Sequence, residues 1–218
     1  MKTFTIISLF PEMFAQVFNS SMLWKAQDKE LVKFNLLNLR NFGLGPRHQV
    51  DDTPYGGGDG MLLMCEPIYK AVEAAKQETP NAKVILMTPR GKLWKQADAQ
   101  SHADSPDDYI IICPHYEGYD ERILKIVDEE ISVGNFILTG GEIPAMSVVD
   151  SIVRLIPGVL GGETSAEIES FSDGDNLEYP QYTRPEVYDG QKVPEVLLSG
   201  HHGKIAEWRS SHSGKVKE

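Results

Sequence analysis

Two glycine-rich segments are the parts of this sequence best suited to hold a ligand for chemistry. Residues 52–61 carry four glycines among residues 56–60, and residues 138–142 contain Gly140 and Gly141. A glycine has no side chain, so its backbone can approach another molecule closely or adopt a positive φ, although ordering it costs entropy. Stiff residues flank both segments, which disfavours the alternative of two mobile surface turns. We therefore expect both segments to contact a bound ligand.

Neither segment matches a common nucleotide-binding motif. The phosphate-loop pattern G-x-x-x-x-G-K-[ST] does not occur, and no G-x-G-x-x-G follows a strand pattern. A hydrolase built from Asp150, Ser151 and a histidine is supported by residue types alone. The glycines therefore predict a ligand, but neither of the two common nucleotide-binding motifs identifies it.

The composition is that of a globular protein with one main core. A chain of 218 residues can form one domain plus an appendage, and 41% hydrophobic residues are ordinary for such a protein. No apolar run approaches the roughly 18 residues of a membrane span, and the N-terminus resembles a strand more than a signal peptide. Cys65 and Cys113 lie among apolar residues without a C-x-x-C pattern, which favours free thiols. We expect a cytoplasmic protein without a membrane partner.

The charge distribution bears on possible partners. A formal net charge of −11 argues against a general nucleic-acid binder, because phosphate contacts need Lys and Arg. Residues 163–189 carry eight acids and a single base, Arg184, whereas residues 191–218 carry five Lys and Arg against three acids, with three histidines besides. This basic, histidine-rich end leaves a local anionic partner open.

Strand and helix patterns alternate along most of the chain. Apolar runs predict strands at residues 3–9, 83–87, 109–113 and 133–138, and an alternating pattern predicts another at 31–39. Helical periodicity predicts helices at residues 11–25, 66–77, 92–101 and 144–156. Strands separated by helices imply an α/β fold, with a parallel sheet flanked by helices on both faces.

Three segments stand where strands of this sheet are predicted to end. Residues 88–91, 114–118 and 139–142 each follow an apolar run directly, and each contains glycine or proline. Open parallel sheets bind ligands beyond the carboxyl ends of their strands. We therefore predict that the three segments meet at one ligand-binding crevice.

The predicted helix at 144–156 has two distinct faces. Ala145, Val148, Val149, Ile152 and Ile156 fall on its apolar side, and Ser147, Asp150, Ser151 and Arg154 fall on the other. From the residues alone, Asp150 and Arg154 form an exposed i,i+4 ion pair. After Pro157 and Gly158 the composition shifts to Gly, Ser, Glu and Asp over residues 160–176, which is typical of a linker.

Longer motifs run in order along the chain. They occupy residues 7–14, 54–58, 116–122, 132–146, 156–160, 182–186 and 199–202, the second reading Pro54-Tyr55-Gly56-Gly57-Gly58 and the fourth ending Thr139-Gly140-Gly141-Glu142-Ile143-Pro144-Ala145-Met146. This series resembles the bacterial tRNA (guanine-N1)-methyltransferases, the TrmD family. It covers nearly the whole chain, as far as Trp208 and Arg209, and such a set of ordered motifs is highly specific.

The resemblance implies both a fold and an activity. The family has a SPOUT-type α/β domain with a deep trefoil knot, acts as a homodimer, and transfers a methyl group from S-adenosylmethionine to N1 of guanosine 37 in the tRNA anticodon loop. The corresponding domains here are a SPOUT methyltransferase domain over residues 1–160, an acidic linker over 161–176 and a shortened helical tRNA-binding domain over 177–218.

The resemblance also assigns binding residues. The cofactor-binding positions that match are Thr88, Pro89, Tyr116, Glu117, Gly118, Ser132, Val133, Gly134, Phe136, Leu138, Thr139, Gly140, Gly141 and Pro144. The RNA-binding positions are Tyr55, Gly56, Gly57, Gly58, Arg184, His201 and His202. The cofactor set overlaps the three predicted strand ends, and the resemblance implies a site shared between two subunits.

The chemistry of this transfer requires two catalytic groups. Guanine N1 carries a proton that a base must remove as the methyl group arrives, and the negative charge that develops on O6 needs a positive donor. By the resemblance, Glu169 fills the first role and Arg154 the second. The family is associated with Mg²⁺, for which the sequence shows no dedicated carboxylate cage; Glu117, Glu169 and the RNA could hold an ion loosely.

Departures from the family pattern support an alternative function. The chain has Glu169 where the family usually has aspartate, and Pro114 where it usually has glycine. The sequence also stops soon after Arg209, whereas the family continues with a basic helical segment. The alternative is a knotted tRNA- or cofactor-binding protein that has lost turnover through these changes.

Overall fold

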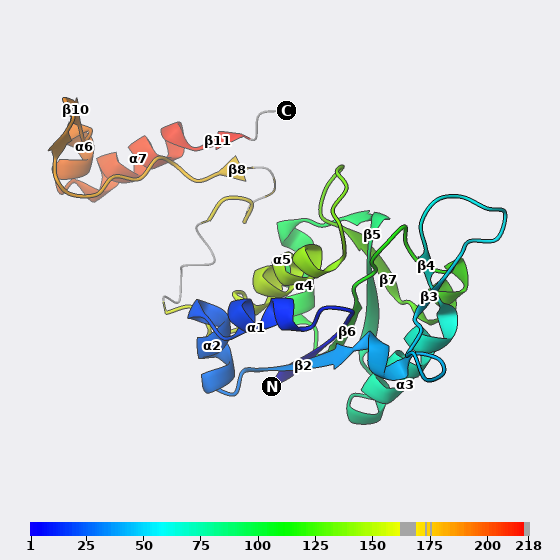
Figure 1. Ribbon diagram of the computed structural model, residues 1–218. Coiled ribbons are helices and arrows are strands. Elements are labelled where there is room, and N and C mark those ends of the chain that lie inside the picture. The colour runs from blue at the N-terminus through cyan, green and yellow to red at the C-terminus, as the bar shows by residue number, and fades with distance from the viewer. Residues whose placement is uncertain (162–168, 173, 175, 216–218) are drawn as a thin grey trace. The chain divides into compact units, whose positions relative to one another are not determined.

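The chain forms two compact units. The computed structural model describes residues 1–161, 169–172, 174 and 176–215, and its contacts divide it into Met1–Gly161 and Gly162–Glu218 (Figure 1). The predicted linker at 161–176 lies partly outside the described residues, so the predicted three-part division stays a prediction. The two units are described one at a time.

A parallel sheet forms the centre of the first unit. Within the described residues its order is β2-β1-β6-β5-β7, and every neighbouring pair is parallel. The strands are β1 (Lys2–Ser8), β2 (Val32–Asn38), β5 (Lys83–Leu93), β6 (Tyr109–Ile112) and β7 (Glu129–Ser132). Because β1 and β6 are buried almost throughout, the sheet must be covered on both faces. The α/β prediction is confirmed.

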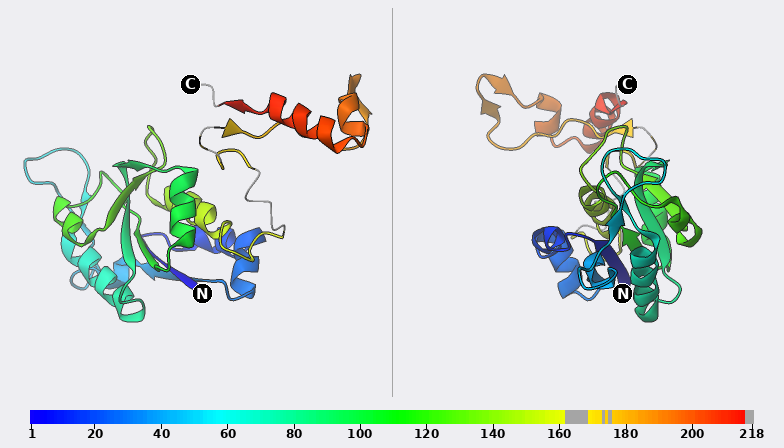
Figure 2. Two further views of the ribbon diagram at one scale, coloured as in Figure 1. Left: turned by 180° about the vertical axis from the view of Figure 1, so that it is seen from behind. Right: turned by 45° about the vertical axis from the view of Figure 1, so that its right-hand side comes forward.

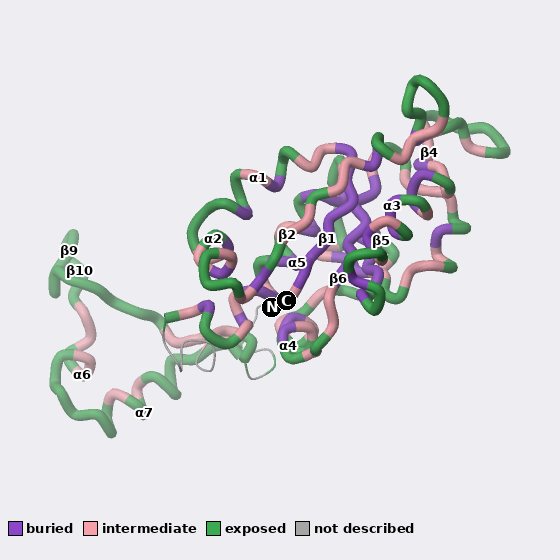
Figure 3. Tube along the Cα trace, turned by 90° about the horizontal axis from the view of Figure 1, so that it is seen from below, coloured by how far each residue is buried: buried purple, intermediate pink, exposed green. Residues whose placement is uncertain are grey.

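Helices cover the two faces of this sheet. They are α1 (Glu12–Phe18), α2 (Ser21–Asp28), α3 (Cys65–Glu78), α4 (Gln96–Asp104) and α5 (Glu142–Val153), with short 3₁₀ helices η1 (Leu39–Phe42) and η2 (Glu121–Ile126). On one face α3 packs with η1 and η2, and on the other α5 contacts α1, α2 and α4 (Figure 2). Figure 3 shows the buried residues gathered along β1, β5, β6 and α5.

The predicted apolar faces of two helices are confirmed. Ile68, Ala71, Val72 and Ala75 of α3 are all buried; they join side chains of β1, β5 and β6 in one apolar cluster. On α5 the buried set includes Ala145, Val148, Val149 and Ile152. Ile156, predicted on the same face, lies beyond the end of α5 and is half-buried.

The predicted strand at 133–138 is wrong. The edge strand β7 ends at Ser132, and the apolar run after it leaves the sheet, with 56% of Phe136 and 79% of Ile137 exposed. A short apolar run has no periodicity that distinguishes a strand from an exposed loop. The predicted helix at 11–25 is likewise two helices, α1 and α2, because Ser20 is extended and Ser21 has a positive φ of 51°.

The second unit is small and rich in aromatic contacts. Its elements are β8 (Asn176–Leu177), β9 (Val187–Tyr188), β10 (Gln191–Lys192), α6 (Glu195–Leu198), α7 (His202–His212) and β11 (Gly214–Lys215). Strand β8 pairs with β11, and β9 pairs with β10, both antiparallel. On α7, Trp208 stacks on His212 with ring centroids 4.1 Å apart, and the Arg209 guanidinium lies 4.7 Å from the Tyr179 ring centroid.

None of the helices formed by the described residues has the length and apolar character needed to cross a membrane.

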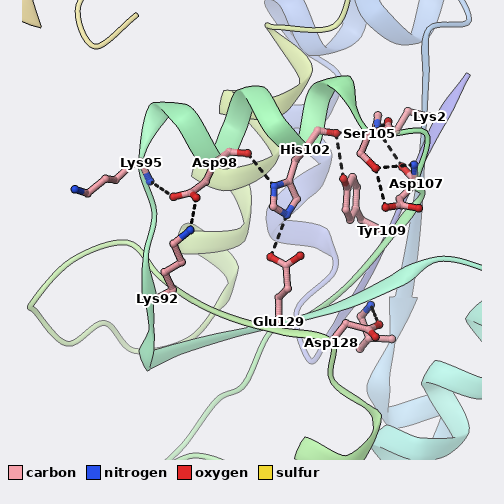
Figure 4. A network of polar contacts seen from close by, with 11 residues as sticks. Lys2, Lys92, Lys95, Asp98, His102, Ser105, Asp107, Tyr109, Asp128 and Glu129 are labelled. Carbon is pink, nitrogen blue, oxygen red and sulfur yellow. Dashed lines mark hydrogen bonds and ion pairs between the residues drawn. The ribbon is translucent and has the colours of Figure 1, made fainter. Parts of the chain in front are cut away.

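A polar network fastens the end of α4 to the sheet (Figure 4). The Lys2 ammonium donates to the carbonyl oxygens of His102, Ser105 and Asp107 at 2.9, 2.6 and 3.0 Å. The His102 imidazole in turn lies 3.2 Å from a Glu129 carboxylate oxygen on β7. A cation at the last carbonyls of a helix is favourable because those groups have no partners within the helix. One lysine at the start of β1 thus orders the chain between α4 and β6.

We expect Lys2→Met to lower the free energy of unfolding by about 1–3 kcal/mol, because three partly buried carbonyls lose their charged donor. Urea unfolding measures the change. The control is Lys33→Met on β2, whose ammonium meets Glu78 at 3.4 Å with both side chains largely exposed. An exposed ion pair contributes at most about 1 kcal/mol. Equal losses of unfolding free energy in the two variants would therefore contradict the idea that Lys2 stabilises the end of α4.

Candidate functional site

The first glycine-rich segment is the tip of a hairpin. Strand β3 (Asp51–Asp52) pairs with β4 (Leu62–Leu63) in antiparallel register. Between them all four glycines have positive φ, from 78° to 127°, and Tyr55 at the tip is fully exposed. Gly56 and Gly57 have no neighbouring atoms where a side chain would stand. These glycines therefore serve the backbone conformation of a projecting loop.

Hydrogen bonds join the base of this hairpin to the segment after β6. The Glu117 N–H donates to the Met61 carbonyl at 3.1 Å, and the Leu63 N–H donates to the Gly118 carbonyl at 2.9 Å. Tyr116 and Gly118 have positive φ values of 61° and 128°. The predicted RNA-binding loop and the predicted cofactor segment at 116–118 are thus held side by side.

The segment at 88–91 is an interruption within a strand, which corrects the prediction that a strand ends there. Strand β5 continues through it to Leu93, and its register with β7 shifts between Met87 and Lys92. Gly91 is required at this point because a side chain there would overlap the Ile131 backbone of β7. The sequence predicts a strand end at Pro89 and Gly91, whereas in the structure these two residues shape a bulge within β5.

Side chains connect this bulge to the segment after β6. The Tyr119 hydroxyl donates to Thr88 Oγ1 at 3.2 Å, and Arg90 donates to both Glu121 carboxylate oxygens at 2.9 and 2.7 Å. Close by, the Arg122 guanidinium makes two hydrogen bonds to Asp120, which hold the pKa of that carboxyl well below its usual range. Two of the predicted cofactor segments are therefore fixed to one another by side chains.

The segment at 139–142 meets the end of β6. The Gly141 N–H donates to the Pro114 carbonyl at 2.8 Å, and His115 pairs with Gly140 in an antiparallel bridge. The prediction that 114–118 and 139–142 come together is confirmed. However, 139–142 is the end of a loop that returns from β7, since no strand directly precedes it.

The glycines of this loop are packed against the protein's own atoms. A side chain at Gly140 would overlap Glu142 Oε2 and His115 Nδ1, and one at Gly141 would meet the Cys113 backbone. At Gly134 it would overlap the Phe136 ring. Close packing within the protein therefore requires a glycine at each of these positions, and the predicted contact of their backbone with a ligand stays a prediction.

The other predicted cofactor residues differ in exposure. Ser132 is buried, with its hydroxyl donating to the Gly134 carbonyl at 3.1 Å. Val133 is half-buried, whereas Phe136, Leu138 and Thr139 are exposed. Because parallel strands end at the same edge of a sheet, we expect these residues to lie at one edge together with the bulge within β5 and the segment that follows β6.

Sequence reasoning missed one buried carboxylate at this edge. Glu142, the first residue of α5, is only 2% exposed. Its Oε1 accepts a hydrogen bond of 2.7 Å from the Ser8 hydroxyl, and its Oε2 lies 3.6 Å from His115 Nδ1. The Cys113 thiol lies in the same buried region, and burial raises its pKa well above the usual range. The motif at 132–146 includes Glu142, but nothing in the pattern marked it as buried.

The two predicted catalytic residues belong to different units. Arg154 caps the end of α5 and is half-buried, with its N–H donating to the Asp150 carbonyl at 3.1 Å. Glu169 lies in a turn in which its carbonyl accepts the Ser172 hydroxyl at 2.7 Å. Arg184, His201 and His202 of the second unit are exposed. The functions predicted for these residues stay predictions.

Each unit also has a pocket that the sequence did not indicate. The first, of about 850 Å³, lies beside the glycine hairpin, and its lining includes Tyr69, Arg122 and Lys125. The second, of about 890 Å³, includes Tyr179, Arg184 and Arg209. The part of the chain that the structure describes contains no cluster of three or more His, Cys, Asp or Glu able to hold a metal.

A parallel sheet flanked by helices, with its connecting loops gathered at the carboxyl edge, places this protein in the class of α/β proteins whose ligands bind beyond the strand ends. The family model described as "tRNA (Guanine-1)-methyltransferase TrmD" matches residues 1–217. The chain belongs to this family, and its fold is the family's SPOUT-type α/β fold.

Individual relatives agree with this assignment. The tRNA (guanine-N(1)-)-methyltransferase of Staphylococcus carnosus is 53% identical over 205 residues, which is 93% of this chain and 82% of the relative. The enzyme of the same name from Carboxydothermus hydrogenoformans is 53% identical over 209 residues, 95% of this chain and 81% of the relative. The crystal structure of tRNA (m1G37) methyltransferase from Aquifex aeolicus superposes with a TM-score of 0.81 at 39% identity, over 97% of this chain and 88% of that one.

Substitution of Gly140 tests the packing of the returning loop. We expect Gly140→Ala to lower the free energy of unfolding by about 1–3 kcal/mol, because the added methyl overpacks the site. The control is Gly161→Ala, where no atom lies within 4 Å of the added carbon. Thermal and urea unfolding of both variants measure the difference, and an unchanged stability of Gly140→Ala would show that the loop has room to move.

Proposed function

We propose that the protein transfers a methyl group from S-adenosylmethionine to N1 of guanosine 37 in the tRNA anticodon loop. The observation that carries the proposal is the match of one methyltransferase family model to residues 1–217. The relatives from Staphylococcus and Carboxydothermus are named for this reaction on guanine N1, and the Aquifex structure is named for position 37.

The residues at the carboxyl edge fit S-adenosylmethionine. Exposed apolar groups of Tyr116, Phe136 and Leu138 offer surfaces to an adenine ring and a thioether, and Thr139 adds an exposed hydroxyl. Thr88 and Ser132 are buried, and their hydroxyls bond to Tyr119 and the Gly134 carbonyl, so their part in the proposed set is to shape the two segments. Pro89, Glu117 and the backbone from Gly118, Val133 and Gly134 to Pro144 complete the proposed binding set. When bound, the sulfonium would supply an activated methyl group, whose carbon the unprotonated N1 would attack while the S–C bond breaks and S-adenosylhomocysteine leaves.

Arg154 and Glu169 perform the proton and charge chemistry in this proposal. The Glu169 carboxylate removes the N1 proton as the nitrogen becomes a nucleophile. The Arg154 guanidinium stabilises the negative charge that develops on O6. A glutamate has the same carboxylate as the aspartate usual in the family but one more methylene, so its turn must place the base slightly differently.

RNA contacts are proposed for both units. The exposed ring of Tyr55 and the glycine backbone at 56–58 suit an unstacked nucleotide, because RNA loops are recognised by stacking and by backbone contacts. Arg184, His201 and His202 are exposed on the second unit and are proposed to contact the tRNA. The proposed substrate is therefore a tRNA with guanosine at position 37.

The working form is proposed to be a homodimer with shared active sites, each combining the cofactor loops of one subunit with Glu169 of the other. Phe136, Ile137 and Ile143 are exposed by 56%, 79% and 51% at the edge of the first unit, and exposed apolar side chains that lie together favour association. Mg²⁺, a trefoil knot and action in the cytoplasm are further parts of the proposal that rest on the family.

A methyl-transfer assay tests the reaction. Labelled S-adenosylmethionine is incubated with an unmodified tRNA transcript carrying guanosine at 37, and in parallel with one carrying adenosine there. We expect incorporation into the guanosine transcript alone. Incorporation into neither, with protein shown to be folded, would favour the binding protein without turnover.

Single substitutions test the two proposed catalytic residues. We expect Arg154→Ala and Glu169→Ala each to lower kcat by about 10²-fold or more, whereas Glu169→Asp retains most of the turnover. Arg47→Ala and Glu178→Ala are matched controls on the same two units. If Glu169→Ala keeps normal turnover, another group removes the proton.

Mixing the two inactive variants tests the shared site. In a mixed dimer of Arg154→Ala and Glu169→Ala subunits, one site would combine both intact residues. Random exchange should then restore about a quarter of the wild-type activity, since about half of the dimers are mixed and each has one intact site of two. No recovery after demonstrated exchange would place both residues in one subunit's site.

A further inference from the structure

The buried carboxylate of Glu142 has no assigned function in the chemistry above. Its side chain is 2% exposed, and the Ser8 hydroxyl donates to its Oε1 at 2.7 Å. Burying an ionised carboxylate is unfavourable unless charges and donors surround it. The start of α5 supplies a favourable dipole, and His115 Nδ1, itself without a hydrogen-bond partner among the described residues, lies 3.6 Å away.

This carboxylate touches three segments that are far apart in the sequence. Ser8 ends β1, and its Oγ also accepts the Phe10 N–H at 2.9 Å, which fixes the turn into α1. His115 belongs to the segment after β6, and its ring packs 4.9 Å from that of Phe10. Gly140 lies so close to Glu142 and His115 that a side chain there would overlap both. The carboxylate is thus the common neighbour of all three segments.

Two of the three segments supply proposed cofactor contacts. Tyr116 and Gly118 follow His115 directly, and Thr139 to Gly141 precede Glu142. The backbone bond from Gly141 to Pro114 at 2.8 Å and the antiparallel bridge between His115 and Gly140 hold the two segments together. The Glu142 carboxylate on one segment faces the His115 imidazole on the other at 3.6 Å, which adds a side-chain contact between them.

We propose that Glu142 is a positioning residue, which holds the 113–116 segment and the 139–141 turn in the arrangement that binds S-adenosylmethionine. The inference rests on the proposed function, because it assigns the two segments to that cofactor. Glu142 does not touch the reacting atoms in this proposal. It acts through His115, Ser8 and the Gly140 backbone.

The test is Glu142→Gln, which keeps the volume and an oxygen for Ser8 but removes the charge. Binding of S-adenosylhomocysteine is measured by calorimetry, and KM and kcat are measured with the guanosine transcript. We expect the dissociation constant and the KM for S-adenosylmethionine to rise about tenfold, a change of 1.4 kcal/mol. At saturating cofactor, kcat should stay within about threefold, because a positioning defect acts on binding.

Hydrogen exchange separates positioning from general stability. In Glu142→Gln we expect faster exchange at the Gly141 amide, which donates to Pro114, and unchanged exchange in the core of β6. The control is Asp128→Asn, which alters a carboxylate on an exposed residue outside the candidate site, the acceptor of the Val84 N–H at 2.8 Å. This variant should lose stability but keep the cofactor affinity of the wild type.

The outcomes distinguish the two hypotheses. A wild type that binds no S-adenosylhomocysteine contradicts the proposed function itself. If the wild type binds S-adenosylhomocysteine and a folded Glu142→Gln binds it with unchanged affinity, the positioning inference alone is overturned. Hydrogen exchange that rises equally across the sheet in Glu142→Gln overturns it as well. If Glu142→Gln does not fold, Ser8→Ala replaces it: a rise in the dissociation constant of about threefold supports the inference, and no rise contradicts it.

Discussion

The hydrogen bond from the Gly141 N–H to the Pro114 carbonyl is the contact on which the arrangement of the candidate site depends. After the edge strand β7 the chain must return past β5 to the end of β6, and this bond closes the return at 2.8 Å. Helix α5 begins at the next residue and packs against α1, α2 and α4. The arrangement of the loops and the packing of α5 on one face of the sheet therefore both depend on where this returning segment meets the end of β6. A shift at Gly141 would disturb both.

The glycines of the candidate site are of two kinds. Gly140 and Gly141 have no room for a side chain, because two segments of the chain pass at van der Waals distance. Gly56 and Gly57 have open space around them and need glycine for a positive φ. The first kind makes a rigid edge and the second a projecting loop. The proposed cofactor site uses glycines of the first kind, and the proposed RNA contacts use glycines of the second.

The same distinction shows how far the sequence predicts the structure. Strands at 3–9 and 109–113 were predictable, because buried parallel strands are continuous apolar runs bounded by polar residues. The strand at 31–39 was predictable from its alternating pattern. The run at 133–138 was not, since its exposed Phe136 and Ile137 have the residue types of a buried strand. Glu142 could not be recognised as buried, because its hydrogen-bond donor, Ser8, lies 134 positions away in the sequence. The assignment of Arg154 and Glu169 came from the family resemblance alone, as the two residues lie in separate units.

The acidic composition constrains how such a chain can recognise RNA. With a net charge of −11, it cannot gain much affinity from the general release of counterions, which requires many Lys and Arg contacts to phosphates. Affinity must instead come from a few placed cations and from aromatic surfaces on which bases stack. The exposed ring of Tyr55 and the exposed Arg184 are groups of these kinds. A weak general attraction with strong local contacts favours discrimination among tRNAs, because sequences that lack the correct nucleotide at the site gain little from the remaining surface.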